Sequence, residues 1–138
     1  MDTGVQLGRR FRALKLWLSL RYHGIEKFRK AIRLNLDQAQ GLAAAVRNCP
    51  VLELMAPVEL SAVCFRHHLA MNATEDERNR FNITLLKRTQ QRGHIYLSNA
   101  VIRGSLCLRA CIVNHRTTAA DIDAVVPEVL AAARECLE

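Results

Sequence analysis

Residues 7–17 read Leu7-Gly8-Arg9-Arg10-Phe11-Arg12-Ala13-Leu14-Lys15-Leu16-Trp17. A glycine stands near the start of this stretch, four basic side chains follow it, and the stretch ends on the only tryptophan of the chain. Written as a helix, it places apolar side chains on more than one side, and a helix of this kind is usually covered on more than one side. We therefore expect it to pack against its own domain and also against a second surface. That surface is either a missing part of the chain or a second subunit.

The rest of the chain alternates between helical and strand-like patterns. The spacing predicts a first helix over residues 8–23, ended by Gly24, and a second over residues 25–48, whose apolar positions advance by three or four. Strands are expected at residues 51–55, 60–66, 94–98 and 105–112, with helices at residues 77–92 and after Thr117 or Thr118. The strand at 60–66 is more continuously apolar than the one at 51–55 and is therefore expected to be more central in the sheet. Pro127 is expected either to bend the last helix or to mark a later start.

This order, α-α-β-β-α-β-β-α, predicts an α+β fold in which helices pack on one face of a small antiparallel sheet. Residues 1–138 are expected to form one domain, made of helix 8–23, helix 25–48 and a sheet-and-helix part over residues 51–138. We see no segment long and apolar enough to cross a bilayer, and arginines interrupt any signal-like run near the N-terminus. The sequence therefore favours a cytoplasmic protein.

The formal net charge of +7 raises the question of nucleic-acid binding. The positive charge is concentrated between Arg9 and Arg33, however, where it alternates with core-type side chains, and only 5% of residues are aromatic. Such a composition supplies a poor stacking platform for single strands. A helix surface that meets an acidic surface in a larger protein explains the same charge. A stand-alone basic α+β module that binds nucleic acid or an acidic protein is the alternative.

No combination of residues predicts a metal site or a self-contained active site. The five cysteines are an odd number without paired spacing, and reduced, buried thiols are the expectation for them. Cys107 and Cys111 share one face of a strand, but two thiols do not make a structural zinc site. His67 and His68 point to opposite faces of a strand, so we expect solvated histidines at the end of that strand. His94 and His115 are read in the same way.

The ten residues from Gly8 to Trp17 resemble the beginning of the small C-terminal domain of pyridoxal-phosphate-dependent (group II) amino-acid decarboxylases. The subgroup is that of the aromatic-L-amino-acid, tyrosine and histidine decarboxylases. Weaker similarity continues at residues 22–27, 63–66 and 108–112 and in the last helix. The resemblance thus covers the whole chain and is sharpest in residues 7–24.

This resemblance implies a fold like the small domain of fold-type I enzymes, which are normally dimeric. The family holds pyridoxal phosphate on a lysine in a His-Lys-aromatic sequence, and no lysine of this chain follows a histidine. We therefore expect the large cofactor-binding domain to be absent from this chain. We also expect the chain to be inactive alone and not to hold the cofactor covalently. The parent would be a carboxy-lyase for an aromatic or related L-amino acid. The partners would be the missing large domain and the second subunit of a homodimer.

The resemblance also implies roles for residues of the first stretch. Leu7 and Gly8 would line the substrate side of the cofactor pocket, reaching in from the partner subunit. The interface would be held by Arg9, Arg10, Arg12 and Trp17. A serine at the position of Gly8 is associated with histidine-type substrates, and Gly8 leaves room for a larger ring; the equal alternative is that Gly8 only starts a helix. Residues 4–6 differ from those of many relatives, so the resemblance does not indicate which amino acid is the substrate of the parent.

Overall fold

The computed structural model describes residues 11–70 and 72–138. Its elements, in chain order, are α1 (Arg12–His23), α2 (Ile25–Arg47), β1 (Leu52–Leu54), β2 (Ala62–His67), α3 (Glu75–Arg92), β3 (Ser98–Ile102), β4 (Ser105–Cys111), α4 (Ala119–Asp123) and α5 (Val125–Leu137). The α+β class and the element order are confirmed, except that the last expected helix is broken into α4 and α5. Pro127 lies in the first turn of α5, where a missing N–H removes no helical hydrogen bond, so it marks the later start.

The four strands form one antiparallel sheet in the order β1-β2-β4-β3. The strand expected at residues 60–66 is therefore central, as its apolar pattern predicted. Strands β3 and β4 form a hairpin in which Ile102 pairs with Ser105. The two residues of the turn, Arg103 and Gly104, have φ values of 52° and 85°. Positive values at both positions are those of a type I′ turn, whose twist matches the twist of the two strands.

The strand expected at residues 94–98 is wrong, because β3 occupies Ser98–Ile102 instead. The apolar run at 94–97 is an extended connection that inserts Leu97 into the core and leaves Tyr96 81% exposed. The tight turn at residues 103–104 sets the register with β4, so pairing extends back from that turn only as far as Ser98.

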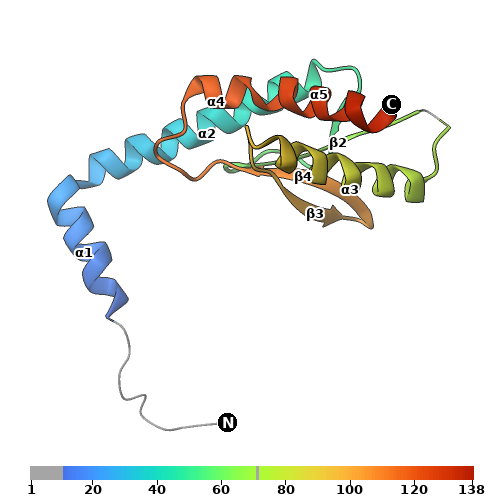
Figure 1. The fold of residues 1–138 in the computed structure, drawn as a ribbon. Coiled ribbons are helices and arrows are strands. Elements are labelled where there is room, and N and C mark those ends of the chain that lie inside the picture. Colours follow the sequence, from blue (N-terminus) through green and yellow to red (C-terminus); the bar gives the residue numbers. More distant parts are fainter. Residues whose placement is uncertain (1–10, 71) are drawn as a thin grey trace, which may run out of the picture.

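Helices α2 and α3 pack against the sheet, and α5 packs against α3 and α2; Figure 1 shows these helices on the same side of the strands. The core is one cluster that joins all of these layers. Its fully buried side chains include Phe65 and Leu108 from the central strands, Leu42 from α2, Leu85 from α3 and Val129 from α5. Burial of this size is the main favourable contribution to the stability of a small domain.

The pairing of β2 with β4 ends at Phe65, which lies opposite Leu108. Beyond this point two asparagines of α3 take the place of the strand ladder. The side-chain oxygen of Asn82 accepts a hydrogen bond from the backbone N–H of His67 at 2.9 Å, and its amide group donates to the carbonyl of His67 at 2.8 Å. The side-chain oxygen of Asn79 accepts from the backbone N–H of Leu106 at 2.8 Å. Buried backbone groups thus keep hydrogen-bond partners where the two central strands separate.

The expectation of solvated histidines is wrong for His67, which is 7% exposed. Strand β2 extends one residue further than the apolar pattern suggested, and the imidazole packs against Phe81 with ring centroids 5.1 Å apart. Its Nδ1 accepts a hydrogen bond from the backbone N–H of Leu69 at 3.0 Å. This contact requires the neutral ring with its proton on Nε2.

We expect the chain to lose stability as the pH falls below about 6.5, the ordinary pKa of histidine. Burial, followed by the nearby His68, lowers the pKa of His67 in the folded state. The unfolded chain therefore binds a proton at His67 more readily than the folded chain, and acid favours unfolding. Urea unfolding at pH 7.5 and 5.5 measures the loss, which should be smaller in His67→Asn. An equal pH dependence in the two proteins would contradict this account.

The cysteines are less uniformly buried than expected. All five are free thiols, and Cys49 and Cys107 are buried. Cys64 and Cys136 are partly exposed and Cys111 is exposed, so the expectation of buried thiols is wrong for Cys111. The alternation of β4 explains this difference, because Cys111 lies on the face of the sheet opposite the core.

A candidate interface and pocket on the N-terminal helices

Helix α1 and the first half of α2, residues 11–36, extend away from the sheet (Figure 1). We call this segment the N-terminal arm. Helix α1 contains no buried residue, and the buried residues of α2 all lie between Gln38 and Val46. Gly24, with φ 76° and ψ 151°, separates the two helices and turns α1 away from the domain. The expectation that the first helix packs on its own domain is therefore wrong. Within the described residues, this helix also starts later than expected, at Arg12.

The arm exposes large apolar side chains on several sides. Phe11 is 69% exposed, Trp17 56% and Tyr22 85%. Other large apolar side chains that are exposed on the arm are Leu14, Leu16, Leu18, Ile25, Ile32 and Leu34. So many exposed large apolar side chains on one short segment are unusual for an isolated soluble domain and favour a surface that another molecule or segment covers.

The same arm carries almost all of the net charge. Residues 11–36 contain seven Lys or Arg against the single acidic residue Glu26, whereas residues 37–138 contain eleven of each sign. The guanidinium carbon of Arg21 lies 5.7 Å from the centre of the Trp17 ring, so one cation of the arm stacks on its largest apolar side chain. A surface complementary to this arm is both apolar and acidic.

The site residues expected from the sequence are only partly described. Leu7, Gly8, Arg9 and Arg10 lie outside the described residues. Arg12 and Trp17 lie on α1 and are exposed. The two expected pocket residues, Leu7 and Gly8, are therefore not described, and the interface roles of Arg12 and Trp17 stay predictions.

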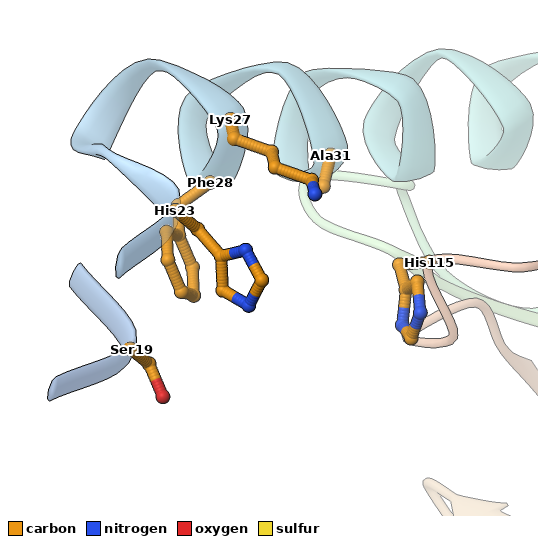
Figure 2. Close-up of a pocket in the computed structure, with 6 residues that line it drawn as sticks. All are labelled: Ser19, His23, Lys27, Phe28, Ala31 and His115. Carbon is orange, nitrogen blue, oxygen red and sulfur yellow. The ribbon is translucent and has the colours of Figure 1, made fainter. Parts of the chain in front are cut away.

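A pocket of about 340 Å³ opens where α1 meets α2. Its lining residues are Ser19, His23, Lys27, Phe28, Ala31 and His115. Figure 2 shows the rings of His23 and Phe28 close together, the Lys27 side chain running along α2, and His115 facing them from the loop after β4. The ring centroids of His23 and Phe28 are 6.3 Å apart. Sequence reasoning missed this arrangement because His115 is distant in the chain and has no local motif around it.

The described residues do not fit pyridoxal phosphate, the cofactor that the family resemblance implies. Lys15, Lys27, Lys30 and Lys87 are all exposed on helices, so no lysine amine is enclosed in a water-excluding site. Lys27 does line the pocket, but no carboxylate accompanies it there to pair with a pyridine nitrogen. Among residues 11–70 and 72–138, no group of three metal-binding side chains could hold a metal ion. In the same residues, no helix is long and apolar enough to cross a bilayer.

Comparison with known proteins shows similarity to one family. The model of the pyridoxal-dependent decarboxylase conserved domain matches residues 1–68. The chain is 33% identical to the aromatic-L-amino-acid decarboxylase of Bacillus atrophaeus over 97% of its own length and 28% of that protein. It is 35% identical to a phenylacetaldehyde synthase of a Rosa hybrid cultivar over 80% of its length and 23% of that protein. The chain thus spans about a quarter of the length of these relatives.

A solved structure shares the fold. The crystal structure of Oryza sativa TDC with PLP and tryptamine matches 97% of the chain and 29% of that protein, with a TM-score of 0.87 and 28% identity. A Rhodiola rosea 4-hydroxyphenylacetaldehyde synthase, at 23% identity and a TM-score of 0.83, shares the fold over 95% of the chain.

Proposed function

Because this chain is a homologue of the pyridoxal-dependent decarboxylases, we propose that it is the C-terminal small domain of a pyridoxal-phosphate-dependent amino-acid decarboxylase. One observation carries the proposal: the Bacillus relative aligns with 97% of this chain but only 28% of its own length. The rest of such an enzyme would lie outside these 138 residues. It would supply the cofactor site that the described residues lack, and the parent would act in the cytoplasm.

The substrate that we propose for the parent is an aromatic or related L-amino acid. Supporting relatives are named as aromatic-L-amino-acid, tryptophan and tyrosine decarboxylases. Others are named as phenylacetaldehyde synthases, so an aldehyde-forming reaction is the alternative to simple decarboxylation. Leu7 and Gly8 would line the substrate side of the pocket, contributed from the partner subunit.

The N-terminal arm would form the interface with the large domain and with the second subunit of a homodimer. Its exposed apolar side chains and its seven basic residues, against one acidic residue, support this role. The facing surface would be apolar and acidic, so that arginines such as Arg12, and by the resemblance Arg9 and Arg10, bind carboxylates and main-chain oxygens. Trp17 would supply a large buried anchor of the kind that dominates interface energies. The small domain alone would be inactive.

The reading frame upstream of the Met1 codon tests the assignment directly. We expect it to continue and to encode a His-Lys-aromatic sequence. The protein purified at its native length should then show the absorbance of bound pyridoxal phosphate and release carbon dioxide, or an aldehyde and carbon dioxide, from aromatic L-amino acids. An in-frame stop directly upstream, together with no cofactor absorbance in the native-length protein, would sink the proposal.

The interface role has its own measurement in the same native-length protein. Reversing two charges of the arm, Arg12→Glu with Lys15→Glu, should weaken self-association by at least tenfold in sedimentation, because each new carboxylate faces an acidic surface. The matched control is Lys87→Glu, a reversal at an exposed position of α3 outside the arm. Equal association of both variants would remove the interface role without touching the decarboxylase assignment.

A further inference from the structure

The face of the sheet opposite the helices carries three cysteine side chains. Alternation along the central strands directs Phe65 and Leu108 into the core. Cys64 of β2 therefore points to the opposite face, and so do Cys107 and Cys111 of β4. The helical side chains of the core cluster pack with Phe65 and Leu108 on the other face.

Cys64 and Cys107 are diagonal neighbours on this face. The residue paired with Cys64 across the two strands is Arg109, and Cys107 precedes Arg109 by two positions. Side chains at such diagonal positions on one face are neighbours across the two strands, and Cys64 is among the causes that raise the pKa of Cys107. Cys107 Sγ also donates to the carbonyl oxygen of Ala100 at 3.5 Å. Burial, followed by the neighbouring Cys64, raises the pKa of Cys107 to about 11, so Cys107 is a protonated thiol held against Cys64.

Cys64 is the accessible member of the pair. It is partly exposed, whereas Cys107 is fully buried. Arg109 lies across from Cys64 on the same face and is exposed, and its Nε donates to Ser98 Oγ at 3.1 Å. A second thiol beside an accessible one is the arrangement of a cysteine that resolves an oxidised neighbour.

From these contacts we propose that Cys64 and Cys107 form a reversible oxidation site for hydrogen peroxide. The proposal is independent of the decarboxylase assignment. Cys64 would react first because it is reachable from solvent, and Cys107 would complete the reaction because it lies beside Cys64 on the same face. Cys111 occupies the other diagonal position beside Arg109 and is exposed, so it is the competing partner that the experiment has to separate.

The chemistry balances with peroxide as the only oxidant. The Cys64 thiolate attacks one peroxide oxygen, the O–O bond breaks, and the other oxygen leaves as water after taking up a proton. Cys64 is then a sulfenic acid. The Cys107 sulfur attacks the Cys64 sulfur, the S–O bond breaks, and the hydroxide leaves as a second water with the proton of Cys107. Two thiols are oxidised to one disulfide while one peroxide is reduced to two waters.

The test uses the chain at its native length, folded, with one equivalent of hydrogen peroxide. Free thiols are then alkylated, and the protein is digested and mapped by mass spectrometry without reduction. We expect a peptide that links Cys64 to Cys107, a loss of the mass of two hydrogen atoms, and full reversal by dithiothreitol. Cys111→Ser should give the same linked peptide. Cys107→Ser should give none and should leave a Cys64 sulfenic acid that dimedone traps.

Three results would overturn the proposal. One is a peptide that links Cys64 to Cys111, and another is a link between two molecules. The third is full alkylation of Cys64 and Cys107 after the peroxide treatment. The wild-type map decides among these outcomes by itself, so the conclusion does not depend on whether a serine at the buried position 107 folds.

Discussion

Replacing Phe65 by alanine is expected to lower the free energy of unfolding by about 3–5 kcal/mol. Phe65 is fully buried in β2, between Leu54 of β1 and Leu108 of β4. Removing its ring takes apolar surface out of the core and leaves a cavity where three strands meet, which the surrounding layers cannot close. Urea unfolding followed by circular dichroism measures the change, with an unaltered slope as evidence that the same surface is exposed on unfolding.

The matched control is Tyr96→Ala, an aromatic-to-alanine change at a side chain that is 81% exposed. Its effect should stay within about 0.5 kcal/mol, as for most surface substitutions. A loss at Phe65 below about 1.5 kcal/mol, well under the usual range for aromatic core deletions, would mean that the core is not built around this ring.

Replacing Asn82 by alanine is expected to produce the second large loss. Asn82 is fully buried in α3, and its amide satisfies both backbone groups of His67 as well as the carbonyl of Arg78, at 2.8 Å. Alanine leaves the N–H and the carbonyl of His67 buried without that partner, and each such group costs about 1–3 kcal/mol. Loss of the side-chain volume adds a smaller cavity term.

Hydrogen exchange gives this prediction a local readout. The amide of His67 should exchange much faster in Asn82→Ala, because its acceptor is gone, while the amides of the β3–β4 hairpin keep their relative protection. Asn99→Ala is the control, since it makes the same change at an exposed position of β3. Equal stabilities of the two variants would show that the strand end does not depend on Asn82.

The sequence predicted the elements whose signals are local. Gly24 ends α1 with a positive φ value, as expected, and Gly93 ends α3 in the same way. The helix that was expected after Thr117 or Thr118 begins after Thr118, which forms a capping box with Asp121. Each of these signals depends on residues within three or four positions of one another.

The features that the sequence did not predict depend on distant contacts. Strand β3 was placed too early because an apolar run looks the same whether it pairs as a strand or only inserts one side chain, Leu97. His67 was read as solvated because its partners, Phe81 and the amide of Asn82, lie on a helix that follows a loop. The apolar side chains of α1 predicted a covered surface but not what covers it, because none of the described residues buries that helix.

Asn82 also begins the tripeptide Asn82-Ile83-Thr84, the acceptor sequence for N-linked sugars. The nitrogen to which a sugar would be attached is the one that donates to the carbonyls of His67 and Arg78 in the folded chain. A glycan on that atom has no room in a fully buried position. Sugar attachment and docking of α3 therefore exclude each other, and production through a secretory pathway would trap the modified chain before it folds.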